Sequence, residues 1–184
     1  MSTTIKTIKQ RYNDMAKTLQ KDLGLDSVML VPRIEKVVVN VGIGKFIKNT
    51  EGLAEVEKGL RDITGQKPLN TKATKSIATF KIREGQDVGM KVTLRGRRMW
   101  DFLNRLVGIS LPRVRDFQGI NIEAIDQSGN LNIGIKEHTI FPEIVAENVR
   151  NSFGFQVTVV SSARNKEDAE KMYRALGFPL KSQK

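Results

Sequence analysis

Few side chains in this sequence are of the kinds that make or break covalent bonds. The chain has 184 residues, one histidine (His138) and no cysteine. Without cysteine there are no disulfides, thiolate metal ligands or cysteine nucleophiles, and one histidine cannot build a multi-histidine metal site. A single histidine without a nearby nucleophile signature is more typical of a structural or surface position than of a catalytic one. We therefore expect no catalytic residue and no metal site.

Glycines that could hold a phosphate follow an apolar stretch at Gly42 and Gly44. The dinucleotide-binding fingerprint needs a third glycine three residues later, where this chain has Ile47. The P-loop pattern GxxxxGK[ST] is also missing from the sequence. Both glycines are more typical of a turn, so we expect no cofactor, no small-molecule substrate and no enzyme.

The chemistry that the chain does offer is binding to polyanions. Between Lys67 and Asp116 there are 12 basic and 4 acidic residues, an excess of +8 within a chain of net charge +11. A solvated charged surface is the usual meaning of such a run. Here asparagine, serine and threonine side chains that suit phosphate and sugar oxygens lie among the cations, which favours nucleic acid. Phe80 could stack on a base, and Trp100 could do so or pack in the core.

RNA is favoured over DNA for this segment. A sheet face of mixed polar residues can reach 2′-hydroxyls and irregular backbone, and no obvious recognition helix for a DNA major groove is present. Two other functions stay open on the residues alone. An enzyme acting on RNA would need clustered carboxylates, several histidines or a cofactor loop. A free RNA chaperone would bind without joining a stable assembly.

Hydrophobic periodicity predicts the elements that position these residues. Helical spacing of apolar residues indicates a first helix over 4–22 and a second between Thr50, as N-cap, and Gly65. Two more helices are predicted around 97–106 and between Asn165 and Gly177. The predicted strands cover 37–41, 88–95, 131–136 and 155–159, and the first of them, mostly valine, is expected to be a buried strand.

The strand over 88–95 alternates strictly between apolar and polar residues, so only one of its faces should be buried. We predict an α+β fold in which a mostly antiparallel sheet has helices packed on one face and a polar, basic face open for RNA. The predicted organisation is an amphipathic N-terminal helix over 1–24, packed on a single RNA-binding domain over 25–184. No 18-residue apolar stretch or secretory signal occurs, which predicts a cytosolic protein without a membrane span.

Several long strings of the sequence are characteristic of one protein family. In chain order they are VPRIEKVVVNVGIG, ITGQKP, TKATKSIATFKIREG, KVTLRGRRMWDFL, LPRVRDFQGIN, GNLNIGIKEHTIFPEI and ALGFP. Together they resemble the bacterial form of the L-five family of large-subunit ribosomal proteins, which bind 5S rRNA. The resemblance runs from about Val31 to Leu180.

The resemblance implies a structural constituent of the large ribosomal subunit, located in cytoplasmic ribosomes and without catalytic activity. It implies an antiparallel sheet with helices on one side, in agreement with the periodicity. It also implies that the protein binds 5S rRNA and helps attach it to 23S rRNA in the central protuberance. The further partners it implies are the P-site tRNA and small-subunit protein S-thirteen, the latter across an intersubunit bridge.

Individual roles carry over from the family to matching positions of this chain. The asparagine of VVVN, the glutamine of TGQ and the threonine of KVTLR bind 5S rRNA in the family, and they are Asn40, Gln66 and Thr93 here. Lys91 and Arg95 share the polar side of their strand with Thr93 and should pair with phosphates. The residues that resemble the family's tRNA-contacting loop are Lys72, Thr74, Lys75, Ser76, Phe80 and Lys81.

A weaker correspondence places Arg113, Arg115 and Asp116 at the intersubunit region or on rRNA. Two positions depart from the family pattern. The pair Gln86-Asp87 stands where Met-Pro is common, which predicts a more flexible and less positive loop tip. Gln118 stands where arginine is usual, which removes one possible phosphate contact. The segment 145–153 follows the family loosely, and we assign it no role.

Overall fold

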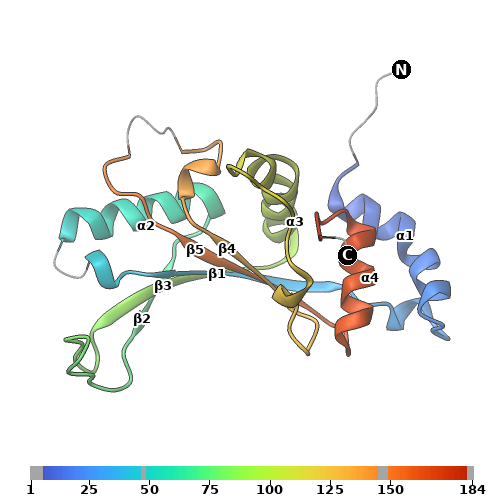
Figure 1. Ribbon diagram of the computed structural model, residues 1–184, viewed down its shortest axis with the longest axis horizontal. Coiled ribbons are helices and arrows are strands. Elements are labelled where there is room, and N and C mark those ends of the chain that lie inside the picture. Colours follow the sequence, from blue (N-terminus) through green and yellow to red (C-terminus); the bar gives the residue numbers. More distant parts are fainter. Residues whose placement is uncertain (1–5, 47–48, 145–148, 182–184) are drawn as a thin grey trace. The chain divides into compact units, whose positions relative to one another are not determined.

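The computed structural model describes residues 6–46, 49–144 and 149–181 (Figure 1). Within these ranges the α-helices are α1 (Ile8–Asp22), α2 (Thr50–Thr64), α3 (Gly96–Arg105) and α4 (Lys166–Leu176). The strands are β1 (Ile34–Gly42), β2 (Leu69–Lys72), β3 (Asp87–Leu94), β4 (Leu131–Ile135) and β5 (Phe155–Ser161). They form one antiparallel sheet in the order β2-β3-β1-β5-β4, which confirms the predicted α+β fold.

The chain groups into two compact units. Unit 1 comprises residues up to 37, 95–133 and 158 onward, and unit 2 comprises 38–94 and 134–157. This grouping does not test the single domain predicted over 25–184, which stays a prediction. No helix in the part of the chain that the structure describes is long and apolar enough to cross a bilayer.

In unit 1, α1 packs against α3 and α4. A capping box at Thr7 and Gln10 starts α1, and the Ile8 N–H donates to Asn104 Oδ1 at 2.8 Å. The helix begins at Ile8, later than the predicted start at position 4. Positions 4 and 5 lie outside the described residues. Trp100 of α3 is half-buried and lies beside Tyr12 of α1, with ring centroids 6.5 Å apart. The choice between packing and base stacking for Trp100 stays a prediction.

The core of unit 1 also holds α4. The Tyr173 hydroxyl lies 3.1 Å from both Gly129 O and Val159 O, which pins α4 to the strand and turn beside it. A buried hydroxyl needs such a partner, because an unpaired one loses its water without compensation. The helix ends at Gly177, whose φ of 88° is left-handed, as predicted from the sequence.

In unit 2, α2 covers one face of the sheet and contacts β3 (Figure 1). Its buried stripe consists of Val56, Leu60 and Ile63. The predicted N-cap was wrong by one residue, because Asn49 accepts a hydrogen bond from the Gly52 N–H at 3.0 Å and Thr50 is the first helical residue. The predicted end is confirmed, since Gly65 closes α2 with a left-handed φ of 69°.

Sequence periodicity missed β2. This strand pairs antiparallel with β3 in the register Leu69↔Lys91, Asn70↔Met90, Thr71↔Gly89 and Lys72↔Asp87. It has only four residues and its side chains are mostly exposed, so it carries no apolar alternation that would signal a strand. The pairing with β3, a tertiary interaction, is what holds this segment extended.

Candidate nucleic-acid interface

The face of the unit 2 sheet opposite the core is polar. In β1, Val39 and Val41 are fully buried and Asn40 between them is exposed. The expectation of a buried strand over 37–41 was therefore wrong for the face that carries Asn40. A strand points successive side chains to opposite sides, so Asn40 needs no buried partner for its amide.

The alternation predicted for β3 is confirmed by the burial of its residues. Val92 and Leu94 are buried, while Lys91 is exposed and Thr93 is half-buried. The Ile43 N–H donates to Val88 O at 3.1 Å, which places the end of β1 beside the start of β3. Lys91 and Thr93 therefore stand on the uncovered side of two adjoining strands, as Asn40 does.

The register of β2 adds two side chains that were not predicted. Residues directly opposite in an antiparallel pair share a face, so Leu69 stands beside Lys91 and Thr71 beside Gly89. Leu69 is 64% exposed, unusual for a leucine in a sheet. The open face, as we call this surface, consists of Asn40, Leu69, Thr71, Lys91 and Thr93. It combines one cation, three polar groups and an apolar side chain.

Gln66 lies in the turn between α2 and β2. Its backbone N–H and O both contact Thr64 Oγ1, at 3.3 and 3.1 Å, while that hydroxyl also donates to Leu60 O at 2.6 Å. These bonds fix the turn, and the Gln66 side chain is half-exposed. It belongs to the same unit as the open face.

Arg95 does not belong to unit 2. It directly follows β3 and belongs to unit 1. It occupies the N-cap position of α3 with extended backbone angles, but its side chain makes no capping hydrogen bond. The first turn of α3 has no side-chain cap bond and no acidic residue. The Arg95 side chain is exposed. An uncapped helix N-terminus carries a partial positive charge, so Arg95 lies in an electropositive setting of its own.

The segment 73–86 is a folded extension of the β2–β3 hairpin. Ala73 N–H donates to Gln86 O at 2.8 Å, and Gly85 N–H donates to Ala73 O at 2.9 Å. Farther out, Ile77 and Ile82 exchange backbone hydrogen bonds of 2.9 and 3.1 Å. We call residues 73–86 the hairpin extension.

Gln86 and Asp87, which stand where Met-Pro is common in the family, do not lie at the loop tip. The expectation that they alter the tip was therefore wrong. Both residues lie at the base of the hairpin extension, where Gln86 Oε1 accepts from the Arg83 N–H at 3.1 Å. Asp87 begins β3, and its Oδ2 accepts from Asn70 Nδ2 at 3.2 Å. These side chains brace the base of the extension.

The tip of the hairpin extension presents an aromatic ring and a cation. Phe80 is 70% exposed, and Lys81 has a left-handed φ of 53°. Such a φ is uncommon outside glycine. The bond from the Lys81 N–H to Ala78 O, at 3.0 Å, closes the turn. Tight closure leaves Phe80 on the outside, where a base could stack on it.

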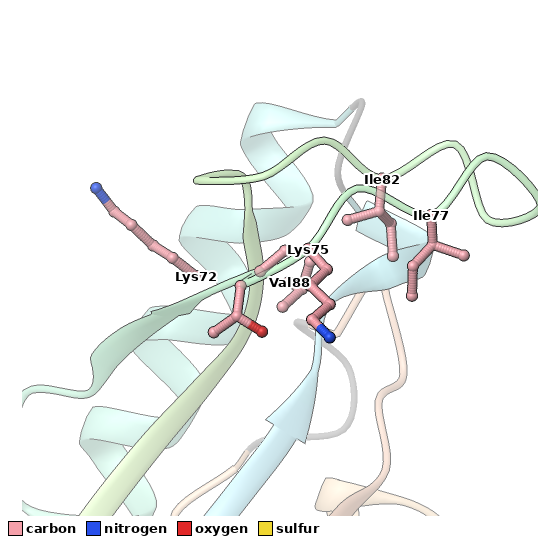
Figure 2. Close-up of a pocket in the computed structure, with 7 residues that line it drawn as sticks. Lys72, Lys75, Ile77, Ile82 and Val88 are labelled. Atoms are coloured by element: carbon pink, nitrogen blue, oxygen red, sulfur yellow. The ribbon is translucent and has the colours of Figure 1, made fainter.

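The other predicted loop residues divide into two groups. Ser76 Oγ accepts from the Glu84 N–H at 2.9 Å, so its main contact ties together the two arms of the hairpin extension. Lys72, Thr74 and Lys75 line a pocket of about 400 Å³ with Ala73, Ile77, Ile82 and Val88 (Figure 2).

The third predicted group lies in unit 1. Arg113 ends a short 3-10 turn, and Arg113, Arg115 and Asp116 are all exposed. Asp116 has a left-handed φ of 55°, so the backbone turns sharply there. These three residues lie near one another because they are close in sequence, not because the fold brings distant segments together.

His138 has the structural role expected of it. It is 2% exposed, and its ring stacks on Phe153 with centroids 4.0 Å apart and an interplanar angle of 12°. Its Nδ1 accepts from the Phe153 N–H at 3.4 Å. Burial lowers the pKa of His138 below 6.5, although the backbone bond and Glu55 act in the opposite direction. The imidazole is therefore neutral and packed at neutral pH.

Among residues 6–46, 49–144 and 149–181, no group of three or more histidine or carboxylate side chains is arranged to hold a metal ion. A sheet with one packed face and one polar face, flanked by a basic extension, defines an α+β binding protein with a surface suited to nucleic acid.

The sequence identifies the family. Residues 27–83 match the model for ribosomal protein L5, and residues 87–180 match the model for the C-terminus of the same ribosomal family. The chain belongs to the L5 family of ribosomal proteins.

Known relatives agree with this assignment. The chain is 49% identical over 174 residues to the large ribosomal subunit protein uL5 of Ureaplasma parvum serovar 3, covering 94% of this chain and 95% of the relative. It is 47% identical over 174 residues to the protein of the same name from Mycoplasma pneumoniae, covering 94% and 97%. These findings confirm the predicted family, the location in cytoplasmic ribosomes and the assignment as a protein other than an enzyme.

Proposed function

We propose that this protein is a structural component of the large ribosomal subunit whose open face binds 5S rRNA. In this role it helps attach 5S rRNA to 23S rRNA in the central protuberance. The observation that carries the proposal is that the exposed Asn40 and Lys91 and the half-buried Thr93 lie on one side of adjoining strands. The family resemblance of Asn40 and Thr93 points to the same surface, and that of Gln66 points to the turn before β2 in the same unit.

The open face offers three kinds of contact to a folded RNA. Lys91 supplies a charge for a phosphate, and the Asn40 amide and Thr93 hydroxyl can hydrogen-bond base edges or 2′-hydroxyls. Leu69 gives an apolar patch on which a ribose or base can rest. Because the strands are held by the sheet, these groups are ordered before the RNA arrives, which reduces the entropy lost on binding.

The hairpin extension is proposed to contact the P-site tRNA. Lys75 and Lys81 provide positive charge along it, and Lys72 adds a charge at the end of β2 just before it. Phe80 provides a stacking surface at its tip. The bonds between its arms make it a preformed projection. Ser76 supports this shape mainly through its bond to the Glu84 N–H.

Two smaller surfaces of unit 1 complete the proposal. Arg95, next to the uncapped start of α3, would bind a phosphate of rRNA. Arg113, Arg115 and Asp116 would contact small-subunit protein S-thirteen or rRNA. The mixed charge of this second group suits a protein surface as well as RNA.

The first experiment is a titration of the purified protein with 5S rRNA, in the presence of tRNA competitor and at several salt concentrations. The proposal expects 5S rRNA affinity on the order of nanomolar that survives competitor, with a salt slope that reports several phosphate contacts. Equal affinity for both RNAs that disappears at moderate salt would contradict it. Co-sedimentation with large subunits through a high-salt gradient separates a stable constituent from a free RNA chaperone.

A further inference from the structure

The pocket on the hairpin extension points to a more specific role than attraction by charge. We infer that it receives a single unpaired nucleotide of the bound RNA, with the base on its apolar floor and the adjoining phosphate at Lys75. This inference rests on the proposed function, because it names what one part of the RNA-binding surface recognises. All seven lining residues lie between 72 and 88, within unit 2.

The floor of the pocket is apolar. Figure 2 shows Ile77 and Ile82 side by side from the two arms of the hairpin extension, with their side chains directed to the same side. Val88, at the start of β3, completes the floor with Ala73. Ile77 is 45% exposed, an apolar side chain facing water on a basic segment. A nucleobase is flat and weakly hydrated on its faces, so it can cover such a surface.

The rim of the pocket carries charge of one sign. Lys72, Thr74 and Lys75 are its polar residues, and none of the seven lining residues is acidic. In Figure 2 Lys75 points to the same side as the isoleucines, whereas the Lys72 side chain points away from them. Lysine binds phosphate as a compact point charge, and threonine can bond a ribose hydroxyl.

The size and order of the pocket agree with this occupant. Its volume of about 400 Å³ falls in the range of small-molecule sites. The paired bonds between Ile77 and Ile82 fix the floor, and the bonds of Ala73 to Gln86 and Gly85 fix the entrance. A preformed site loses less entropy when it binds. An apolar side chain of a partner protein could also cover the isoleucines, but the charge of Lys75 beside them favours a group that carries a phosphate.

The decisive variant fills the pocket without changing its charge. Ala73→Leu adds volume at a lining position, and Ala54→Leu makes the same change at an exposed position of α2, outside the hairpin extension and the open face. Affinity for tRNA and for 5S rRNA is measured by fluorescence anisotropy for both variants and the wild-type protein. We expect Ala73→Leu to weaken the binding of tRNA about tenfold, and Ala54→Leu to leave both affinities within about twofold.

A second measurement uses the wild-type protein, so that it does not depend on the folding of a variant. Adenosine 5′-monophosphate and ribose 5-phosphate are titrated separately while the methyl resonances of isoleucine and valine are followed by NMR. The nucleotide should shift Ile77, Ile82 and Val88 but leave the core residue Ile63 unchanged. Ribose 5-phosphate, which lacks the base, should leave the three pocket methyl groups nearly unshifted.

Three results would overturn the inference. They are equal binding by the two leucine variants, equal methyl shifts with both phosphates, and methyl shifts with neither. Its failure is distinguishable from failure of the proposed function. If Lys75→Ala with Lys81→Ala weakens tRNA binding while Ala73→Leu has no effect, the hairpin extension binds RNA by its charged surface alone. If neither change affects any RNA, the tRNA-binding role of the extension fails as well.

Discussion

Thr71 lies directly over Gly89 across the β2–β3 pair. A Cβ atom added at Gly89 would stand 2.7 Å from Thr71 Oγ1 and 3.0 Å from Val41 O, closer than side chains tolerate. The lack of a side chain at Gly89 therefore leaves room for the Thr71 side chain of β2 on one side and for the β1 backbone at Val41 on the other. The register of β2 on β3 places Leu69 beside Lys91 and Thr71 beside Gly89, on the open face.

Gly89→Ala should destabilise the fold by about 1–3 kcal/mol, because the added methyl group forces Thr71 or the β1 backbone to move. Urea unfolding monitored by circular dichroism measures this change. Gly134→Ala is the matched control, since Gly134 is also a strand glycine and has nothing within 4 Å of an added Cβ. Equal unfolding free energies for the two variants would show that the contact at Gly89 is not restrictive.

Asn40→Ala and Thr93→Ala should each weaken 5S rRNA binding by about 1–3 kcal/mol, because a polar group of the RNA loses its partner at the interface. The free energy of unfolding should change by less than about 0.5 kcal/mol for Asn40→Ala, since Asn40 is exposed. Filter binding with labelled 5S rRNA measures the affinity. Asn121→Ala, an exposed asparagine of unit 1, is the control. Unchanged affinity in both test variants would remove these residues from the contact surface.

Lys75→Ala combined with Lys81→Ala should weaken P-site tRNA retention while 5S rRNA binding stays nearly intact. The reason is that both lysines lie on the hairpin extension, whereas the open face holds the groups proposed for 5S rRNA. Reconstituted ribosomes and a tRNA dissociation assay give the measurement. Lys17→Ala with Lys171→Ala removes the same charge from exposed helix positions. Equal loss of tRNA and 5S rRNA binding would argue that the extension is no separate contact.

The protein should lose stability as the pH falls below about 6.5. Burial lowers the pKa of His138, so in the window between its folded pKa and 6.5 the unfolded chain binds more protons than the folded chain. Stability therefore rises with pH across this window and levels off above it. The measurement is the free energy of unfolding in urea at several pH values from about 5 to about 7.5, the range in which histidine titrates.

His138 is the only histidine in the sequence, so the titration can be assigned to it. His138→Phe keeps the stacking partner of Phe153 and removes the titrating group, and its stability should vary less over the same window. The pKa of Glu55 is lowered, chiefly by its hydrogen bond from the Asn151 side chain, so Glu55 affects stability only at more acidic pH, below 4.5. An unchanged pH slope in the variant would assign the effect to other groups.

The amino-acid sequence by itself determined the features that depend on local patterns. The alternation around Val92 and Lys91 predicted which side of β3 is polar, and Gly65 and Gly177 predicted where α2 and α4 end, because only glycine adopts a left-handed backbone easily. The single histidine and the missing cysteines predicted a protein without catalytic side chains. Long family strings predicted the L5 family.

Tertiary structure decided what local patterns could not carry. Strand β2 is too short and too polar to be predicted from an apolar pattern. It is held extended by its pairing with β3, and this pairing places Leu69 and Thr71 on the open face. The same pairing brings Ile77 opposite Ile82 and forms the pocket from residues that read as a basic loop. Asn40 looked buried within an apolar run, but helix α2 covers only one face of the sheet. Strand pairing and the side that a helix covers are long-range choices, set by which apolar surfaces can be buried together.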